Sequence, residues 1–583
     1  MTEPLAPPTS PSPEAPARSR TRSRWLWFLV VGWAAQVLVR IASARGQVAP
    51  FVQPDESGYL VAARWLTGGP GADLSGSAFY QPGYSLLLVP AHLLADDPGT
   101  VYRLVLVTNA LVGAAAFPLA FLALLRLGLD RVSAAPLAWS AALLPAASFW
   151  GQMAMADSVF TVVVLAWLLC LDRFVRTAAL PAAAAANLLA CYAYALHGRG
   201  AVILAVHAAA MAWHALRRER RRSVVALGML LPGVGAALAF NSLVRDGLYP
   251  GGVLGLEGEL WNRLTSWSGQ MWALGTGAGQ VWALLTATWM IGGVGAVVVV
   301  ARLAHRDTAY EDRLLAAVLL AATSGVAYLT AAALPDEQRF GNHAYVRYLS
   351  CFALVYTLAG LAALVRTVRV ARPALVATAV FACLGLLVWA RVSRLPEDYG
   401  YLGHDFPEVG LLGGFWGGLR PLWTSLTASL LLLLFLGLRR LGPRALATGL
   451  LVVNALAMLV ITAALARPGT TADVVPPGAP SGGVAIARPF GGHPNLFLIV
   501  RARTTFSVWW TELEFFDPRQ GPPRPGVCSV VVNWPGGTAL DATWPAHPQG
   551  WRARGAEMRS RKLRWAVWSS PGCPVRPGGT VRG

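Results

Sequence analysis

The sequence predicts an all-α polytopic membrane bundle followed by a small C-terminal all-β domain. Of the 583 residues, 55% are hydrophobic and only 13% are charged, whereas soluble domains carry about 25% charged residues. Apolar runs of about 20 residues, long enough to cross a bilayer, recur along the first four-fifths of the chain. After residue 467, Pro and Gly increase and short alternating runs replace the long ones, as in small β domains.

The net charge of +19 comes almost entirely from arginine, because Lys562 is the only lysine. Many arginines cluster at the ends of apolar runs, as the positive-inside rule predicts. A nucleic-acid-binding protein would need a soluble basic surface, and here the basic runs border lipid. We therefore exclude nucleic acid as a partner and expect membrane lipids.

Three regions follow along the chain. Residues 1–24 are rich in Pro, Ser and Arg and predict a disordered cytoplasmic tail. Residues 25–467 form the membrane domain, whose first apolar run is too long for a signal peptide and is interpreted as an anchor. The thirteen predicted spans cover 25–45, 101–125, 133–150, 157–172, 178–196, 200–216, 224–244, 281–301, 314–334, 346–365, 374–393, 421–438 and 446–466.

The arginine clusters lie at alternate ends of these spans, which predicts a plasma-membrane protein with a cytoplasmic N-terminus and an extracytoplasmic C-terminus. The segments on the outer side are then long and those on the inner side short, so we expect chemistry on the outer face. Two helices too short to span, Ser57 to Leu66 and Tyr80 to Leu94, are expected along the outer surface. The long outer segments are 46–100, 245–280, 335–345 and 394–420.

Residues 468–583 predict the β domain, and their many tryptophans either stack on sugar faces or fill the domain core. Cys528 and Cys573 lie in this region, and an extracytoplasmic location would favour a disulfide between them. The other four cysteines lie in apolar runs, where a free thiol acts as a small hydrophobe. The strand-like runs are Phe497 to Arg501, Phe506 to Phe515, Val527 to Val532 and Leu563 to Val567.

Two adjacent carboxylates, Asp55 and Glu56, follow the first span closely. At the start of an amphipathic helix, one carboxylate can face a cleft while its neighbour turns to solvent or to a metal. The alternative is that Asp55 caps the helix, a common use of aspartate. The residue types alone leave both interpretations open.

Three further charged residues are predicted at outer span ends. Asp157 begins span four, where an acid is costly unless it is functional, paired or a helix cap. Arg199 stands between two glycines and either approaches a phosphate or snorkels to the interface. Arg347 lies at the outer start of span ten and suits a phosphate or carboxylate partner, or it anchors the span together with Tyr348.

These residues together resemble the GT-C glycosyltransferases, in particular the polyprenyl-phosphate-sugar-dependent group with the protein mannosyltransferases and the aminoarabinose transferase. The first outer segment carries the specific part of the resemblance, Asp55-Glu56-Ser57-Gly58-Tyr59 followed by Tyr80-Gln81-Pro82-Gly83-Tyr84. Asp157 with Phe160, Arg199, and Arg347-Tyr348 add short matches, although the family often has Glu where Asp157 stands. The resemblance covers spans one to ten and not the C-terminal domain.

The resemblance implies a catalytic set of Asp55, Glu56 and Asp157. Asp55 would be the general base that takes the proton of an acceptor hydroxyl, with inversion at the anomeric carbon. Glu56 and Asp157 would orient the acceptor or hold a divalent cation, and metal use stays open. Arg199, Arg347 and His343 would bind the donor phosphate, and the acceptor or donor would be positioned by Tyr59, Tyr80, Tyr84 and Tyr348.

The function that the resemblance implies is an integral membrane glycosyltransferase acting in cell-envelope synthesis on the outer face. Its partners would be a polyprenyl-phosphate-linked sugar and a glycan, lipid or protein acceptor. A transporter or flippase of lipid-linked sugars is one alternative, although such a protein needs charge inside the bundle. A non-catalytic envelope assembly protein, with the C-terminal domain as its binding module, is the other.

Overall fold

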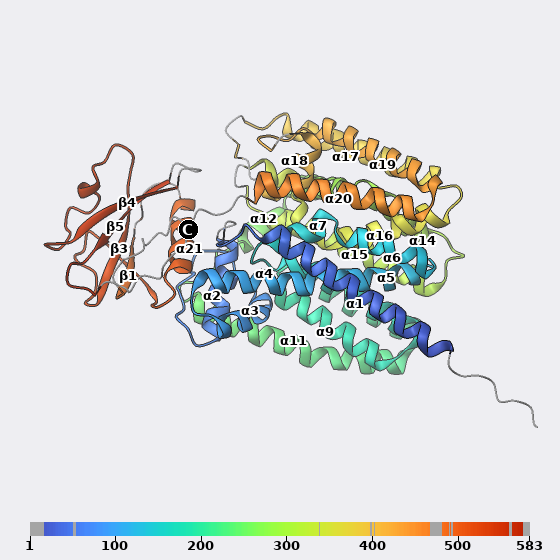
Figure 1. Ribbon diagram of the computed structural model, residues 1–583, viewed down its shortest axis with the longest axis horizontal. Helices are drawn as coiled ribbons and strands as arrows, with labels where there is room; N and C mark the ends of the chain where they lie inside the picture. The colour runs from blue at the N-terminus through green and yellow to red at the C-terminus, as the bar shows by residue number, and fades with distance from the viewer. Residues whose placement is uncertain are drawn as a thin grey trace, which may run out of the picture.

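The computed structural model describes residues 17–50, 54–336, 339–396, 399–400, 403–414, 416–466, 481–488, 490, 494–558 and 563–574. Over these ranges the chain forms a helical bundle with a small sheet-containing domain at one end (Figure 1), here called the domain end of the bundle. The predicted helical bundle with a C-terminal sheet is therefore confirmed. Helix α1 (Ala17–Ala44) already includes the end of the predicted tail, and residues 1–16 lie outside the described residues.

Nine helices of the described chain are long and apolar enough to cross a bilayer, and each coincides with a predicted span. The protein is thus a polytopic membrane protein. The nine are α1, α4 with α5 (Pro98–Ala114 and Ala116–Arg126), α8 (Asp157–Thr177), α10 (Gly200–Arg217), α11 (Arg220–Leu248), α15 (Tyr310–Ala333), α17 (Ala371–Val392), α19 (Pro421–Leu438) with the short η5 (Arg439–Leu441), and α20 (Pro443–Leu465).

The four remaining predicted spans are also helical, but none is a straight helix of spanning length. Two are bent pairs, which raise the number of candidate spans to eleven if each pair counts as one. The other two are helices of 17 residues, α9 and α16. The bent pairs are α6 (Arg131–Ala142) with α7 (Pro145–Ser148) and η1 (Phe149–Gln152), and α13 (Trp267–Ala287) with α14 (Ile291–Ala304); α9 is Leu180–Leu196 and α16 is Ser350–Arg366.

The predicted continuous span 281–301 is wrong, because the chain turns by 118° between α13 and α14. Trp289 and Met290 adopt positive φ angles of 53° and 62° at this turn, a conformation that costs energy for residues other than glycine. Burial compensates: both side chains are fully buried, and Trp289 Nε1 donates to Asn454 Oδ1 at 2.7 Å. The break is invisible to hydropathy because the residues on both sides are apolar.

Polar side chains and prolines mark where several helices begin. Asp97 accepts a hydrogen bond from the Thr100 amide at the start of α4, and Asp130 accepts two from the first turn of α6. Such caps satisfy backbone N–H groups that have no partner within the helix. Prolines occupy the first positions of α4, α19 and α20, where a missing N–H costs nothing.

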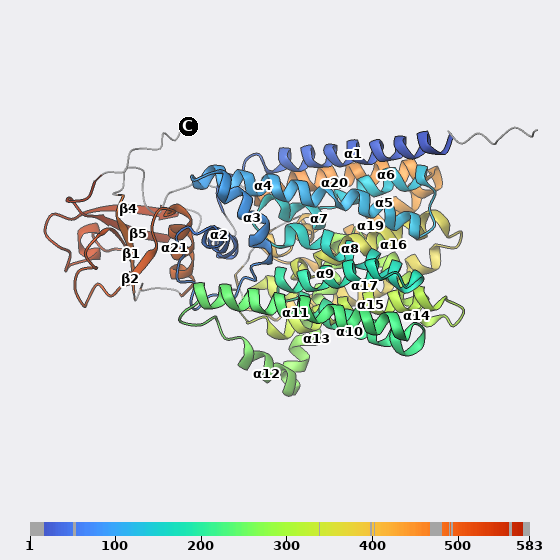
Figure 2. The same ribbon diagram turned by 90° about the horizontal axis from the view of Figure 1, so that it is seen from below.

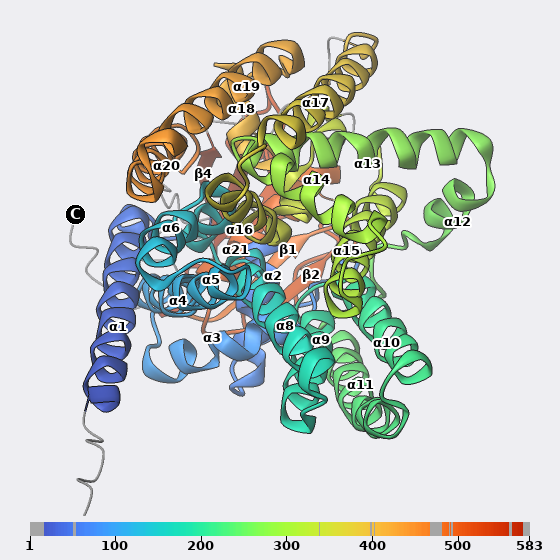
Figure 3. The same ribbon diagram turned by 90° about the vertical axis from the view of Figure 1, so that its right-hand side faces the viewer.

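Short helices gather toward the domain end. Two of them, α2 (Asp55–Leu66) and α3 (Gly83–Leu94), form where the sequence predicts short helices. Helix α2 is not the predicted surface helix, however, because its residues 56–64 are all buried. Helix α12 (Glu257–Thr265), which was not predicted, projects away from the bundle beside α13 (Figure 3). The remaining short elements are η2 (Phe340–His343), η3 (Val346–Tyr348), η4 (Gly403–Asp405) and α18 (Pro407–Gly413).

Glycines allow α14 and α16 to pack backbone against backbone. A Cβ atom at Gly360 of α16 would overlap the carbonyl oxygen of Ile291, and one at Gly295 of α14 would overlap the backbone of Tyr356 and Gly360. Small residues at such crossings are typical of membrane helix pairs, because close approach increases van der Waals contact.

Gly360→Ala is therefore expected to lower the thermal midpoint of the purified protein in detergent, because two helices must separate to admit one methyl group. Gly228→Ala is the matched control, since Gly228 lies in α11 with open space around its missing side chain. Alanine favours helix by about 1 kcal/mol over glycine, so the control should match or exceed the wild type. Equal midpoints for the two variants would contradict this account.

The C-terminal domain contains a five-stranded mixed sheet with strand order β2-β1-β3-β5-β4. Strand β1 pairs in parallel with β2 and β3, whereas β5 pairs antiparallel with β3 and β4. The strands are β1 (Gly483–Ala487), β2 (Leu513–Phe516), β3 (Val527–Asn533), β4 (Arg552–Met558) and β5 (Leu563–Ser569), with η6 (Leu540–Thr543) between β3 and β4.

The run Phe497 to Arg501, predicted as a strand, belongs instead to helix α21 (Pro494–Ser507). Strands β1 and β2 run parallel, and parallel neighbours need a crossover connection, usually a helix. Val500 on α21 packs with Phe497 against the apolar face of the sheet. The domain is therefore a sheet with one covering helix rather than all β.

The tryptophans of this domain divide by burial. Trp544, Trp565 and Trp568 are among the largest fully buried side chains of the described chain, so these three fill the core and present no face to a sugar. Partly buried Trp534 stacks beneath the Arg564 guanidinium, with 3.5 Å between the cation and the ring centroid. Carbohydrate binding by the remaining tryptophans stays a prediction.

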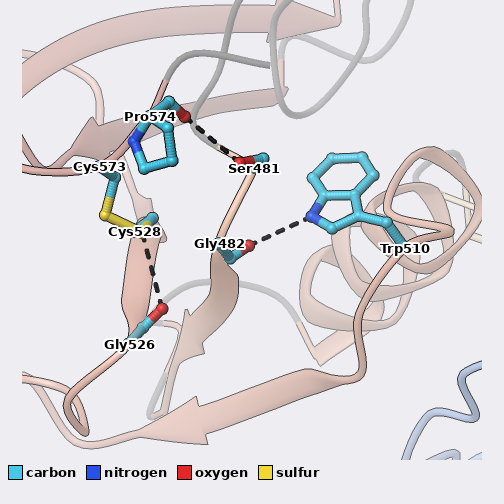
Figure 4. Close-up of a disulfide and its surroundings, with 7 residues drawn as sticks. All are labelled: Ser481, Gly482, Trp510, Gly526, Cys528, Cys573 and Pro574. Atoms are coloured by element: carbon cyan, nitrogen blue, oxygen red, sulfur yellow. Dashed lines mark hydrogen bonds between the residues drawn. A yellow bond between two sulfur atoms is a disulfide. The ribbon is translucent and has the colours of Figure 1, made fainter. Parts of the chain in front are cut away.

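Cys528 and Cys573 form a disulfide, as predicted (Figure 4). The bond joins the start of β3 to the segment that follows β5, across 45 residues. Closing a loop of that length restricts the unfolded chain and stabilises the folded domain by about 4 kcal/mol in the chain-entropy model.

Reduction is expected to lower the unfolding temperature of the C-terminal domain while the bundle keeps its own transition, because the closed loop lies wholly within the domain. Differential scanning calorimetry with and without dithiothreitol measures both transitions. A Cys528→Ser/Cys573→Ser variant serves as the control, since dithiothreitol should leave its transitions in place. A reductant effect of equal size in that variant would show that the lowered unfolding temperature does not come from the Cys528–Cys573 disulfide.

Candidate active site

Asp55 is the first residue of α2, yet its side chain does not cap the helix. Its two oxygens instead accept hydrogen bonds from residues far away in the sequence: Oδ1 from the Tyr80 hydroxyl at 3.1 Å and Oδ2 from Arg347 Nη1 at 2.7 Å. The side chain remains 24% exposed. Asp55 is therefore a carboxylate oriented by two donors and open to solvent, rather than a helix cap.

Arg347 lies in η3 and bridges two carboxylates. Its Nη1 bonds to Asp55, while its Nε donates to Asp157 Oδ2 at 3.0 Å. Its guanidinium also lies over the Trp150 ring, 5.5 Å from the centroid. Only 9% of the side chain is exposed. The guanidinium is thus fixed in orientation by partners on three elements.

Asp157 and Arg199 form the buried part of the cluster, since both side chains are fully inaccessible. Arg199 donates one hydrogen bond to Asp157 Oδ1. Its Nη1 reaches the main-chain carbonyls of Arg347 at 2.9 Å and Tyr348 at 3.2 Å. Arg199 therefore holds both Asp157 and the turn that carries Arg347.

The glycine after Arg199 has a packing role. A Cβ atom at Gly200 would overlap the backbone of Ala193 in α9, so only glycine permits the tight connection between α9 and α10. This connection carries Arg199 back toward Asp157.

The acid–arginine cluster, defined as Asp55, Asp157, Arg199 and Arg347, balances two negative charges against two positive ones. Burying charge costs several kcal/mol per ion unless partners and hydrogen bonds compensate. Here every carboxylate oxygen accepts a hydrogen bond from a guanidinium or a phenol. The sequence predicted that these four residues share one face, and the structure brings them into direct contact.

Glu56 adjoins Asp55 but points elsewhere. It is fully buried, and its Oε2 accepts hydrogen bonds from the Tyr102 hydroxyl at 2.6 Å and the Ala154 amide at 2.8 Å. These bonds connect the start of α2 to α4 and to the segment just before Asp157. In the structure, Glu56 therefore orients α2. Its predicted catalytic role remains a prediction.

Three predicted positioning tyrosines form an edge-to-face aromatic cluster, which contacts Asp55 through Tyr80. Tyr59 lies edge-on between Tyr80 and Tyr84, at centroid distances of 5.6 and 5.2 Å. Burial, together with the nearby Asp55 carboxylate, raises the pKa of Tyr80 well above its ordinary value. Tyr80 therefore keeps its proton at neutral pH and remains a donor to Asp55. The fourth predicted tyrosine, Tyr348, packs against Tyr345 with the two rings tilted and their centroids 4.6 Å apart.

His343 is not brought to the cluster. It packs against Trp272 of α13 with a centroid distance of 5.7 Å, and neither ring nitrogen has a hydrogen-bond partner among the described residues. Burial, with a further contribution from Arg391, lowers the pKa of His343 to about 4. A neutral histidine has no charge to offer a phosphate at pH 7, so its predicted role in phosphate binding has no support here.

Sequence reasoning missed Asn109, in the middle of α4. Its Oδ1 accepts from the Tyr84 and Ser158 hydroxyls at 2.8 and 3.0 Å, and its Nδ2 donates to the Met153 carbonyl at 2.7 Å. Asn109 thereby ties α3 and the start of α8 to one point in the bundle. The available signal was an asparagine inside an apolar span, since such residues often bond between helices.

The predicted cation ligands Glu56 and Asp157 do not fit a divalent metal. Both oxygens of Asp157 accept from guanidinium groups, which compete directly with a cation, and Oε2 of Glu56 already accepts from Tyr102 and Ala154. Among the described residues, no three His, Cys, Asp or Glu side chains lie close enough together to hold a metal ion. A dication needs several free oxygen ligands, so we derive no step through one.

The sequence matches no protein-family model and no curated protein. Solved structures are similar in fold. ArnT from Cupriavidus metallidurans bound to undecaprenyl phosphate has a TM-score of 0.53 at 16% identity, over 93% of this chain and 98% of ArnT. The apo form of ArnT has a TM-score of 0.49 at 14% identity, over 94% and 98%. Arabinosyltransferase EmbB from Mycobacterium smegmatis has a TM-score of 0.41 at 17% identity, over 80% of this chain and 43% of EmbB.

The likeness to undecaprenyl-phosphate-bound ArnT extends over nearly the whole of both chains. It shows that this chain has the GT-C fold, as the resemblance in the sequence predicted.

Proposed function

With the GT-C fold as the premise, we propose that this chain is an integral membrane glycosyltransferase that uses a polyprenyl-phosphate sugar. It moves the sugar to an acceptor hydroxyl on the outer face of the membrane, with inversion. The observation that carries the proposal is the pairing of a partly exposed carboxylate, Asp55, with a fixed guanidinium, Arg347, at 2.7 Å. Such a pair supplies a base and a phosphate-binding cation side by side.

In the proposed reaction, the acceptor oxygen attacks the anomeric carbon of the donor sugar. The bond from that carbon to the phosphate oxygen breaks, and its electrons leave on polyprenyl phosphate. The acceptor proton passes to Asp55 as the new bond forms. A carboxylate suits this step because the hydroxyl becomes acidic only when attack is under way.

Arg347 stabilises the negative charge that develops on the leaving phosphate. Its Nη1 bonds to Asp55 in the structure, so an arriving phosphate competes for this guanidinium and releases the carboxylate. Nε stays bound to Asp157, which keeps the guanidinium in position during the exchange. Arg347 thus couples donor binding to the freeing of the base.

Asp157 and Arg199 then act through Arg347 rather than on the substrate. Both are fully buried, and Arg199 bonds to the main chain of the turn that bears Arg347. We therefore assign the donor phosphate to Arg347 and make Arg199 a positioning residue, a narrower assignment than the sequence suggested. Glu56 and Tyr80 are positioning residues as well: Glu56 orients α2, and Tyr80 orients Asp55.

Two features support an extracytoplasmic active site. Disulfides persist in oxidising compartments, and the Cys528–Cys573 bond lies in the domain next to the cluster. The arginine clusters at alternate span ends also favour an outward C-terminus. A plasma-membrane enzyme of the cell envelope, with a glycan, lipid or protein acceptor, agrees with both.

The test is transfer in membranes supplied with undecaprenyl phosphates that carry labelled sugars, arabinose and mannose among them. We expect label in a new glycosidic bond and release of undecaprenyl phosphate, and we expect Arg347→Met to lose both. Movement of the labelled lipid across the bilayer without bond formation would contradict the proposal and favour a transporter.

A further inference from the structure

We infer that the C-terminal domain is part of the catalytic machinery, because its helix α21 fixes α2 and thereby positions Asp55. This inference rests on the proposed function. The positioning residues are Arg64 at the end of α2, and Arg501 and Phe506 on α21. Figure 2 shows α21 between the sheet and α2. Hydrogen bonds from Arg64 to the C-terminal end of α21 confirm that the two helices are in contact.

Arg64 joins the two helices end to end. Its Nη1 donates to the carbonyls of Thr505 and Val508, at 3.1 and 3.2 Å, at the C-terminal end of α21. These carbonyls lack partners within the helix, and the helix dipole favours a cation there. Arg64 Nε also donates to the Pro70 carbonyl at 2.6 Å, so one side chain closes the turn after α2.

Arg501 makes the reverse connection, from α21 to the loop between α2 and α3. It is 2% exposed, and it donates to the carbonyls of Ser75 at 2.7 Å and Leu74 at 3.4 Å. That loop leads directly to Tyr80, which donates to Asp55. The domain therefore also restrains the segment that carries Tyr80, the second hydrogen-bond donor to Asp55.

Phe506 contacts the other end of α2 indirectly. Its ring lies 6.2 Å from that of Tyr102, whose hydroxyl donates to Glu56. Glu56 follows Asp55 in the sequence. Helix α2 is thus held at its C-terminal end by Arg64 and at its N-terminal end by Glu56. The end of α21 supplies the carbonyls that Arg64 binds, and Phe506 of α21 packs against Tyr102, the partner of Glu56.

The sheet supports α21 on its opposite side. Val500 and Val508 are fully buried against Val484, Ile486 and Trp565. A helix fixed on a sheet moves as one body with it, and α2 extends only about 14 Å from Arg64 to Asp55 at 1.5 Å per residue. A small displacement of α21 therefore reaches the base, and misplacing a catalytic group by about 1 Å can cost on the order of a hundredfold in rate.

The experiment compares Arg64→Met and Arg501→Met with two matched controls. Arg103→Met and Arg554→Met remove exposed arginines from α4 and β4. Backbone hydrogen exchange of the full chain in lipid nanodiscs should accelerate about tenfold or more at residues 56–66 in the two test variants, because hydrogen bonds to a charged donor are lost. Exchange in β3 and β5 should stay at the wild-type rate, as it should throughout both controls.

For transfer from a labelled undecaprenyl-phosphate sugar, we expect kcat to fall about thirtyfold in the test variants while KM for the donor stays within about threefold. Arg64→Lys should recover most of the loss, since lysine can also bond the end of α21. Unchanged exchange in α2, faster exchange without a loss of kcat, or loosening of the sheet together with α2 would each overturn the inference. Absence of transfer in the wild type would overturn the proposed function, while the exchange result would still decide whether α21 holds α2.

Discussion

Replacing Asp55 with asparagine is expected to lower kcat for sugar transfer about a thousandfold, within the range for loss of a general base. Asparagine keeps the size of the side chain and one oxygen acceptor for Tyr80, but an amide cannot take the acceptor proton. The measurement is transfer of labelled sugar from undecaprenyl phosphate by purified protein in nanodiscs.

Donor binding should respond in the opposite direction. Arg347 Nη1 bonds to Asp55 in the structure, and removing the negative charge frees this guanidinium for phosphate. The dissociation constant of undecaprenyl phosphate should therefore stay the same or decrease in Asp55→Asn. A combined loss of rate and of phosphate binding would indicate a folding defect instead.

Asp97→Asn provides the matched control, because Asp97 is an exposed acid that caps α4. Asparagine caps a helix about as well as aspartate, so this variant should transfer sugar at the wild-type rate. Undiminished transfer by Asp55→Asn would remove Asp55 from the role of base.

The sequence sufficed to predict nine of the thirteen spans as helices of spanning length in the described chain, and to select the four members of the acid–arginine cluster, because hydropathy and charge at span ends are local signals. It did not predict which atoms meet. Asp55 and Arg347 are separated by 292 positions and Asp157 and Arg347 by 190. Only the packing of α2, α8 and η3 determines that one guanidinium bridges both acids.

Local sequence signals do not reveal tertiary contacts, and this also explains two misassigned details. Phe497 to Arg501 suits a strand by residue type, and it becomes a helix because β1 and β2 are parallel. The glycines around Arg199 suggest phosphate binding, whereas Gly200 is required by the contact with Ala193. In each case a tertiary contact outweighs the local pattern.

The buried half of the cluster leads to the second prediction. Asp157→Leu removes the carboxylate that Arg199 and Arg347 share, and so leaves Arg199 buried without a counter-charge. Breaking a buried ion pair from one side costs about 3–5 kcal/mol. The thermal midpoint in detergent should therefore fall sharply, and transfer should be lost because Arg347 is no longer held at Nε.

A double variant separates the cost of an unpaired charge from the cost of lost packing. In Asp157→Leu/Arg199→Leu no unpaired cation remains at this position, and Arg347 still bonds to Asp55. The double variant should therefore be more stable than Asp157→Leu alone, a non-additivity that a double-mutant cycle measures directly. Transfer should stay low in the double variant, because the turn bearing Arg347 has also lost the hydrogen bonds from Arg199.

Asp246 supplies the matched control, since it forms an ion pair with Arg245 in which both side chains are exposed. Exposed pairs contribute about 0–1 kcal/mol, so Asp246→Leu should leave both the midpoint and transfer near the wild type. If the double variant were as unstable as the sum of its single changes, the charges of Asp157 and Arg199 would not be coupled. The cluster would then be a set of packed side chains, and the fixed orientation of Arg347 would need another cause.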